Sequence, residues 1–390
     1  MRYQNSTFYA NHKFDDGEPK YASIIKELLA KADIQVNGSR DWDMRIHNPE
    51  FYKRVLLRGS IGLGESYMDG WWDVPKLEVF FTKLLLAHVD RNVPGLGKFS
   101  HHLFRVWNIL VNRQSLSRAF RVGEVHYDIG NELYRAMLDS SMSYSCGYWK
   151  DAVDLEQAQQ NKLKLVCEKL KLEPGMRLLD IGCGWGGLAE YAVRNYGVEV
   201  TGITISKQQK KLAEERVKGL PVEIRLQDYR LLDEKYDRIV SVGMFEHVGA
   251  KNYRTYFKKV AEVLDEQGLI LLHTIGTEYN NNQPDPWVDK YIFPNGQVPS
   301  RIRITSASRD VLRLEDWHNF GPDYDQTLMA WWKNFDAAWV QLKSGFDKRF
   351  YRMWKYYLHC CAGYFRSRNG QLWQLVFSHP ASTISYHSVR

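Results

Sequence analysis

The feature that most constrains the fold of this 390-residue chain is a regular alternation of strand-like and helix-like runs that begins near residue 155. The strand candidates are short and rich in aliphatic residues, and they read RLLDIG, VEVTGITIS, VEIRLQDYR, YDRIVSVGMF and GLILLHTIG. Helical patterns such as KQQKKLAEERVKG and YRTYFKKVAEVLDEQG separate them. Alternating elements of this length predict a doubly wound, Rossmann-like α/β domain with a mostly parallel sheet.

A glycine-rich turn, DIGCGWGG, follows the first of these strands. Gly182 and Gly184 allow a sharp turn and let a ligand approach bare backbone. A dinucleotide site favours G-x-G-x-x-G, whereas this stretch reads G-C-G-W-G-G after an acidic residue, Asp180. The stretch resembles the first motif of S-adenosylmethionine-dependent methyltransferases. We therefore predict a class I methyltransferase domain in which Asp180, Gly182 and Gly184 contact the cofactor.

The ends of the next two strands also carry candidate cofactor ligands. Methyltransferases of this kind commonly place an acid at the end of the second strand, but Thr204 stands there instead. The Thr204 hydroxyl and the Gln209 amide can bond the ribose in its place. After the third strand, Asp228 can accept from the adenine amino group and Tyr229 can pack on the adenine ring.

The fourth strand ends in a carboxylate and an imidazole, Glu246 and His247, as catalytic sites in open α/β sheets do. Two interpretations of Glu246 fit its position. The carboxylate takes part in chemistry, or it stabilises the first turn of the following helix. His247 is expected to lie on the following helix, to point in a different direction from Glu246 and to be structural.

The N-terminal part has a different pattern. YASIIKELLAKADI and LEVFFTKLLLAHV read as amphipathic or apolar helices, and Pro94 and Gly95 mark a break. We predict a small N-terminal helical, lipid-binding domain over 1–95, a basic amphipathic linker over 96–125 and a catalytic domain over 126–390. The linker carries four arginines among apolar residues: Arg105, Arg113, Arg118 and Arg121. Such a helix lies on anionic lipid or packs its apolar side on the next domain.

Composition excludes several classes of protein. No apolar run approaches the ~20 residues that span a bilayer, and the N-terminus lacks a signal-peptide core, so a cytoplasmic protein is expected. The five cysteines are odd in number and form no C-x-x-C pair, which argues against disulfides and a metal site. The net charge of +7 suits an anionic partner, either nucleic acid or a membrane surface. A nucleic-acid methyltransferase would show an N-P-P-Y-like or cysteine nucleophile motif past the fourth strand, where MFEHVG stands instead.

From about residue 21 onward the chain closely resembles bacterial cyclopropane-fatty-acyl-phospholipid synthases, which are related to the mycolic acid cyclopropane synthases. The resemblance rests on a series of motifs in one order: GLGESYMDGWW, HYDIGNELY, MSYSCGYW, DIGCGWGG, MFEHVG, LLHTIG, KYIFPNG and EDWHNFGPDYDQTL.

The resemblance implies an enzyme that transfers the methyl carbon of S-adenosylmethionine to the cis double bond of an unsaturated phospholipid acyl chain. A cyclopropane ring forms through a carbocation, S-adenosylhomocysteine leaves, and a bound bicarbonate ion serves as the base. A related fatty-acyl methyltransferase that gives a methyl or methylene branch is the alternative. The resemblance also implies a homodimer at the inner membrane face, whose partners are the bilayer surface and its acyl chains and not nucleic acid.

Site residues are carried over from the matching motifs. Cys146, Glu246, His273 and Tyr324 are expected to surround the bicarbonate, with the backbone of Ile275. Cys361 matches a residue near the site, and Tyr144 and Ser145 match positions near the methionine end of the cofactor. Glu246 either takes the proton itself or orients the anion that does, and the resemblance favours the second role.

Overall fold

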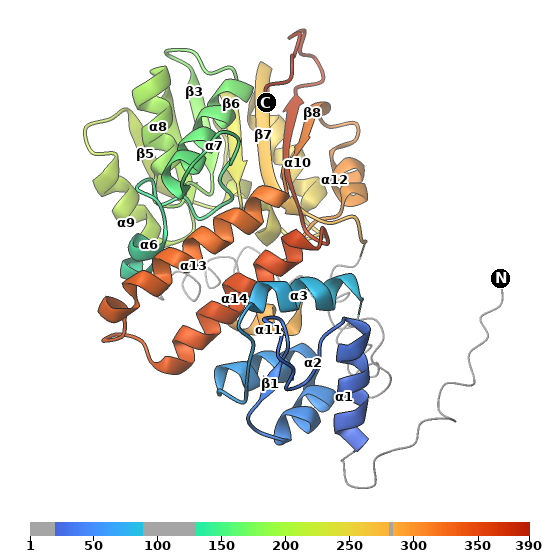
Figure 1. Ribbon diagram of the computed structural model, residues 1–390. Helices are drawn as coiled ribbons and strands as arrows, with labels where there is room; N and C mark the ends of the chain where they lie inside the picture. Colours follow the sequence, from blue (N-terminus) through green and yellow to red (C-terminus); the bar gives the residue numbers. More distant parts are fainter. Residues whose placement is uncertain (1–19, 89–129, 281–283) are drawn as a thin grey trace, which may run out of the picture.

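The computed structural model describes residues 20–88, 130–280 and 284–390, which form a central sheet flanked by helices (Figure 1). The strand order is β5-β4-β3-β6-β7-β9-β8. The strands are β3 (Arg177–Ile181), β4 (Glu199–Thr204), β5 (Val222–Leu226), β6 (Tyr236–Val242), β7 (Leu264–Gly276), β8 (Arg313–Asn319) and β9 (Gln371–Ser378). The first five are the predicted strands, and each pairs in parallel with its neighbours among them. The predicted α/β class is confirmed.

The two remaining strands, β8 and β9, were not predicted. β9 pairs antiparallel with β7 on one side and with β8 on the other. Every residue of β9 is buried, so its sequence, QLWQLVFS, lacks the alternation of a half-exposed antiparallel strand. This arrangement places β9 beside His273, which lies opposite Gln374 in the register.

Both faces of the sheet are covered because successive strand residues point to opposite sides. Leu178 packs with α7 (Leu155–Lys169) and α8 (Gly187–Tyr196), whereas Leu179 packs with α10 (Tyr253–Val263) and α12 (Arg301–Ser308). The helix α9 (Lys207–Arg216) contacts β4 and β5. Capping defines the start of α7, where the Asp154 carboxylate accepts a hydrogen bond from the Gln157 amide at 2.8 Å.

The N-terminal residues form a helical unit beside α13 (Pro322–Leu342) and α14 (Lys348–Arg366) (Figure 1). The unit contains α1 (Lys20–Lys31), α2 (Glu50–Met68), α3 (Leu77–Leu86) and the short antiparallel pair β1 (Arg45–Ile46) and β2 (Trp72–Asp73). Its apolar side chains belong to the same core cluster as those of α13, α14 and the short helix α6 (Asn131–Met137). The boundary predicted near residue 95 lies outside the described residues.

One segment joins the N-terminal helices to the turn that follows β6. It contains α11 (Pro286–Tyr291) and continues to Gln297. On α2, the buried carboxylate of Glu65 accepts a hydrogen bond from Lys290 Nζ at 2.8 Å. Farther along, the Gln297 amide donates to the Glu246 carbonyl at 2.8 Å. This segment therefore ties α2 to the turn that carries Glu246.

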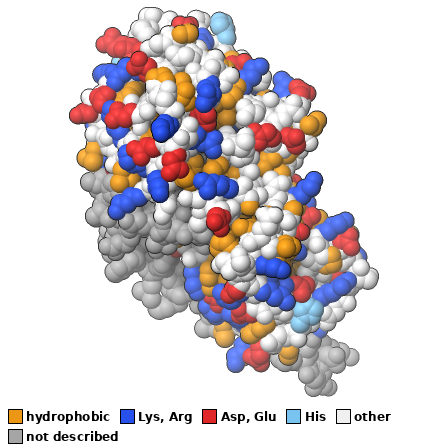
Figure 2. Space-filling model, turned by 90° about the vertical axis from the view of Figure 1, so that its left-hand side faces the viewer, with side chains coloured by type: hydrophobic (Ala, Val, Ile, Leu, Met, Phe, Trp, Pro, Cys, Tyr) orange, Lys and Arg blue, Asp and Glu red, His pale blue; other side chains and the backbone are white. Residues whose placement is uncertain are grey.

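The basic excess does not form a single patch on the face shown in Figure 2, where positive and negative side chains are interspersed. The predicted basic linker, with its four arginines, lies outside the described residues. In the part of the chain that the structure describes, none of the helices has the length and apolar character needed to cross a membrane.

Candidate active site

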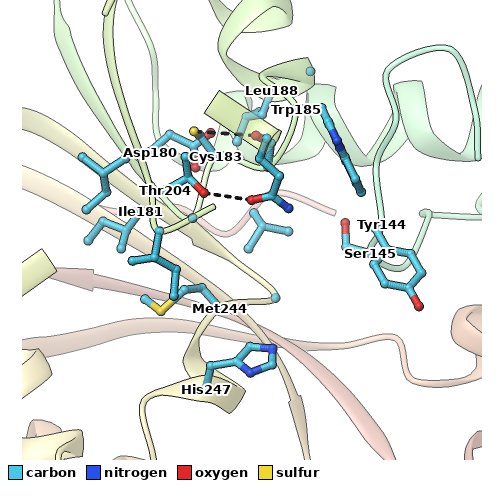
Figure 3. Close-up of a pocket in the computed structure, with 18 of the residues that line it drawn as sticks. Tyr144, Ser145, Asp180, Ile181, Cys183, Trp185, Leu188, Thr204, Met244 and His247 are labelled. Carbon is cyan, nitrogen blue, oxygen red and sulfur yellow. Dashed lines mark hydrogen bonds between the residues drawn. The ribbon is translucent and has the colours of Figure 1, made fainter. Parts of the chain in front are cut away.

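A cavity of about 210 Å³ lies at the carboxyl ends of β3, β4, β5 and β6 (Figure 3). This is the edge of an open parallel sheet where ligands bind. Residues 141–145, side chains of α7 and the loop at Pro294 complete the wall.

The residues predicted to bind the cofactor all line this cavity: Tyr144, Ser145, Asp180, Gly182, Gly184, Thr204, Gln209, Asp228 and Tyr229. Tyr144 and Ser145 lie on one side of it, and Asp180 and Thr204 lie on another (Figure 3). Residues that bind one cofactor must line one cavity, and these residues do. Their contact with a bound cofactor stays a prediction.

The glycine turn presents bare backbone to the cavity. Gly182 has φ of 87° and Gly184 has φ of 54°, a left-handed region that side chains rarely adopt. A Cβ atom at Gly182 would lie 2.9 Å from Cβ of Met244, which also lines the cavity. A side chain at Gly182 would therefore be strained and would displace part of the wall.

The polar groups beyond β4 and β5 are already partly engaged. The Thr204 hydroxyl donates to Gln209 Oε1 at 2.8 Å, which leaves the Gln209 amide nitrogen for a ligand. The Asp228 carboxylate accepts hydrogen bonds from the Arg230 amide and guanidinium at 2.7 to 2.9 Å. A carboxylate accepts about four hydrogen bonds, so Asp228 keeps some capacity for an adenine amino group.

Sequence reasoning missed Lys162, a buried lysine of α7 that lines the cavity. Its Nζ donates to the Ser143 hydroxyl at 2.9 Å and to the Ser145 hydroxyl at 3.3 Å. Burial lowers its pKa to about 8, while Asp139, Cys146 and Asp180 oppose the shift. The signal was present in the sequence, because Lys162 falls on the buried face of α7, four residues after Ala158.

Glu246 is buried in the turn after β6, beside the end of β7. The Ile275 amide donates to its Oε1 at 2.7 Å, whereas its buried Oε2 has no hydrogen-bond partner among the described residues. Burial raises the pKa of this carboxyl to about 7, and the Ile275 hydrogen bond opposes the shift. The Ile275 backbone, which was predicted to help hold the anion, thus lies beside Glu246 in the structure.

His273 lies on β7 and is fully buried. The Gln374 amide nitrogen lies 3.3 Å from Nδ1 of His273. If this amide donates the hydrogen bond, Nδ1 is the acceptor and the ring proton is on Nε2. Nε2 has no hydrogen-bond partner within the described part of the chain. Burial, and then the charges of Lys162 and Lys169, lower the pKa of His273 well below its usual value, so the ring is neutral.

The other predicted catalytic residues lie in the same region. Cys146, Phe320 and Leu372 form one small apolar cluster, and Ile275 and Tyr324 pack against it. The Phe320 ring lies 5.9 Å from the ring of His273. Burial, and after it the influence of Tyr357, Cys146, Glu246 and Cys361, raise the pKa of Tyr324 well above its usual value. The structure therefore brings Cys146, Glu246, His273, Ile275 and Tyr324 to one region, and Cys361 packs with Tyr324 against the neighbouring large core cluster.

Aromatic rings form a wall beside these residues. Tyr324 stacks on Phe365 with a centroid distance of 4.4 Å and an interplanar angle of 17°. The Tyr144 ring lies 5.1 Å from that of Trp331, and its hydroxyl lies 2.8 Å from the Tyr357 hydroxyl. Such faces attract a positive charge nearby.

His247 lines the cofactor cavity, whereas its neighbour Glu246 does not (Figure 3). It lies in a short 3-10 turn, η3 (Phe245–His247), and not on the regular helix that the sequence suggested. Burial lowers its pKa to about 4. The imidazole is therefore a neutral part of the cavity wall.

The parallel sheet, the glycine turn and the cavity above β3, β4 and β5 define a class I S-adenosylmethionine-dependent methyltransferase. Solved structures agree with this class. The cyclopropane synthase MmaA2 from Mycobacterium tuberculosis matches with a TM-score of 0.63 and 29% identity, over 66% of this chain and 97% of that chain. The mycolic acid cyclopropane synthase CmaA1, complexed with SAH and CTAB, matches with a TM-score of 0.62 and 31% identity, over 66% and 97% of the two chains.

The chain belongs to the mycolic acid cyclopropane synthetase family, whose model matches residues 114–375. It is 56% identical over 359 residues to the cyclopropane-fatty-acyl-phospholipid synthase of Escherichia coli K12. The matched region covers 91% of this chain and 92% of the relative. It is also 33% identical to the tuberculostearic acid methyltransferase UfaA1 of Mycobacterium tuberculosis, over 83% of this chain and 80% of the relative.

Proposed function

We propose that the protein transfers the methyl carbon of S-adenosylmethionine to the cis double bond of an unsaturated phospholipid acyl chain and closes a cyclopropane ring. The adjacency of two sites carries this proposal. Ser145 and His247 line the cofactor cavity, while their chain neighbours Cys146 and Glu246 belong to the second site. A methyl group held in the cavity would therefore meet a substrate held at the second site. The name of the Escherichia coli relative supports the choice of substrate.

The reaction has two steps for which the residues must account. The π electrons of the alkene bond to the methyl carbon as its bond to sulfur breaks, and positive charge moves to the acyl chain. Loss of one proton from the added carbon then closes the ring. The first step is assisted by negative charge and aromatic faces, which Glu246, Tyr324 and Trp331 supply. The second step needs a general base.

The base is either Glu246 or an anion that Glu246 orients, and the second site fits bicarbonate. Bound bicarbonate would supply the base in this reaction. Two buried atoms at this site, Glu246 Oε2 and His273 Nε2, have no hydrogen-bond partner among the described residues. Where the Gln374 amide donates to His273 Nδ1, Nε2 carries the ring proton and needs an acceptor, while an ionised Glu246 needs a donor. Bicarbonate offers both a hydroxyl and acceptor oxygens. Glu246, His273, Tyr324, Cys146 and the Ile275 backbone would hold it.

Bicarbonate dependence distinguishes the two bases. We expect turnover to fall in carbon dioxide-free buffer and to return when bicarbonate is added. Full turnover without bicarbonate would assign the proton to Glu246.

The product distinguishes cyclopropane formation from the alternative, a methyl or methylene branch. The protein is expressed in a bacterial host that lacks cyclopropane lipids, and the acyl chains are analysed by mass spectrometry and proton NMR. We expect a mass gain of one methylene group together with cyclopropane methylene protons. A methyl or methylene signal would favour the alternative, for which the relative UfaA1 is a precedent.

The substrate bond lies inside a bilayer, so we propose that the protein docks on the inner membrane face as a peripheral homodimer. The basic segment over 96–125 supplies the attraction to anionic headgroups, worth about 1 kcal/mol per basic residue near the surface. The alternative is that this segment packs between the two domains.

A further inference from the structure

A buried glutamine, Gln374 on β9, belongs to a row of polar side chains that crosses three strands. In the register of the sheet it stands opposite His273 on β7 and opposite His318 on β8. Residues directly opposite each other in antiparallel strands point to the same face of the sheet. The three side chains therefore lie next to one another on the face that α7 covers, where Nζ of Lys169 lies 3.1 Å from Nδ1 of His318.

The amide of Gln374 is not explained by the packing of β9. Leu372 and Val376, two positions to either side on the same strand, are apolar and as fully buried as Gln374. Gln374 Oε1 is buried and has no hydrogen-bond partner among the described residues. A buried carbonyl without a donor lowers stability, so an apolar side chain of similar size would suit this position if folding were the only demand. The amide therefore points to a function for its nitrogen end.

The nitrogen end of this amide meets a histidine of the second site. Nε2 of Gln374 lies 3.3 Å from Nδ1 of His273. A neutral histidine carries one ring proton, and the hydrogen bond made at one nitrogen decides which nitrogen has it. An amide N–H only donates, so Nδ1 accepts and the proton lies on Nε2. This Nε2 is buried without a partner in the described part of the chain, and the ring lies 5.9 Å from that of Phe320, in the cluster that contains Cys146.

The second site needs a donor at this place. It contains the buried carboxylate of Glu246, whose Oε2 lacks a hydrogen bond from any described residue, and it would hold the anion proposed as the base. A histidine protonated on Nε2 presents a proton to this negative charge, whereas the other tautomer would present a lone pair, which repels it.

We propose that Gln374 is a positioning residue, whose hydrogen bond to Nδ1 of His273 holds the ring in the tautomer that presents Nε2–H to the negative charge of the second site. The inference rests on the proposed function and deepens it, because it states how a neutral histidine is made a donor to an anion.

The test uses the full chain with isotope-labelled histidine, and it compares the wild type with Gln374→Met and Gln371→Met. Methionine is close to glutamine in length but cannot donate a hydrogen bond. Gln371 is the matched control, because it is a buried glutamine of β9 that bonds the Asn319 side chain and the Arg368 carbonyl. A spectrum of His273→Gln identifies the His273 signals among those of the 12 histidines. Nitrogen NMR then gives the tautomer, and kinetics give turnover as a function of bicarbonate concentration.

In the wild type we expect a protonated Nε2 and an unprotonated, hydrogen-bonded Nδ1. In Gln374→Met the Nδ1 signal should lose the shift that this hydrogen bond causes. The bicarbonate concentration for half-maximal turnover should rise by about tenfold, as the loss of an outer partner of a ligand histidine does at metal sites. The affinity for S-adenosylhomocysteine should stay unchanged, and Gln371→Met should keep the wild-type spectrum and bicarbonate dependence.

A wild type that carries the proton on Nδ1 would overturn the proposal without any variant. A folded Gln374→Met that is less stable but keeps the wild-type His273 signals and bicarbonate dependence would overturn it in favour of a structural role. A wild type whose turnover does not respond to bicarbonate would instead refute the proposed base. The tautomer of His273 would in that case still decide the role of Gln374, because NMR reads it in the resting protein.

Discussion

Replacing Glu246 by glutamine should change the pH dependence of stability as well as the activity. The carboxyl is buried, and its pKa is raised from 4.5 to about 7 in the folded protein. The folded state therefore binds a proton more tightly than the unfolded state does. As pH rises from about 4.5 through 7, the unfolded chain loses this proton first, and the wild type loses stability.

The size of the effect follows from the shift. A difference between 4.5 and about 7 corresponds to a loss on the order of 3 kcal/mol once both states are ionised, and most of it develops between pH 5 and 8. Glutamine has no such titration. Its Oε1 can still accept from the Ile275 amide, so the substitution removes the charge and preserves that contact.

The assay is urea unfolding of the wild type and Glu246→Gln at pH 5 and pH 8, in buffer without bicarbonate. The free energy of unfolding of the variant, minus that of the wild type, should rise by roughly 2 kcal/mol or more between the two pH values. Glu266→Gln, which changes an exposed glutamate, is the matched control and should show little change with pH. A difference that stays constant with pH would refute the reasoning, because it would mean that Glu246 ionises in the folded state as it does in the unfolded chain.

Three further results are expected. Glu246→Gln should lower turnover by about a hundredfold or more, and Cys146→Ser should also lower it, while calorimetry shows near-normal S-adenosylhomocysteine affinity, because both residues belong to the second site. Loss of affinity in step with rate would contradict these roles. Gly182→Val should abolish cofactor binding while circular dichroism shows an intact fold, since the Cβ of the valine would lie 2.9 Å from Met244. A variant that binds the cofactor as tightly as the wild type does would contradict this expectation. Vesicle sedimentation should show weaker, less salt-sensitive binding to anionic lipid when four linker arginines are replaced by glutamine, and unchanged binding with the fold intact would exclude the electrostatic role. These arginines are Arg105, Arg113, Arg118 and Arg121.

The parallel half of the fold could be predicted because its signals are local. Each strand from β3 to β7 contains a short aliphatic run. The glycines that follow β3 mark a tight turn, because they adopt the left-handed backbone that such a turn needs. The position of β9 in the sheet could not be predicted in this way. It pairs with β7 and β8, far away in the chain, and no periodicity of its own sequence specifies those partners.

The candidate site shows the same division. The cofactor residues from Asp180 to Tyr229 lie at or after strand ends, where the fold class places ligands, so they could be predicted from sequence position. Tyr144 and Ser145 lie between two helices and came from the resemblance. The grouping of Cys146, His273 and Tyr324 came from resemblance alone, because these residues lie on separate elements. Lys162 was missed because a lysine within a helix usually faces solvent, and only its spacing relative to the buried residues marked it.

The place of β9 in the sheet has a consequence for biosynthesis. β9 lies between β7 and β8 but follows both in the chain, so a growing polypeptide emerges from the ribosome with β7 and β8 unjoined. The parallel strands and the cofactor cavity can form earlier, since domains tend to assemble from the N-terminal side during translation. His273 acquires its neighbour Gln374 only when β9 inserts. A nascent chain would thus be able to hold its methyl donor before the second site is complete, and transfer to lipid would begin only after β9 has been made.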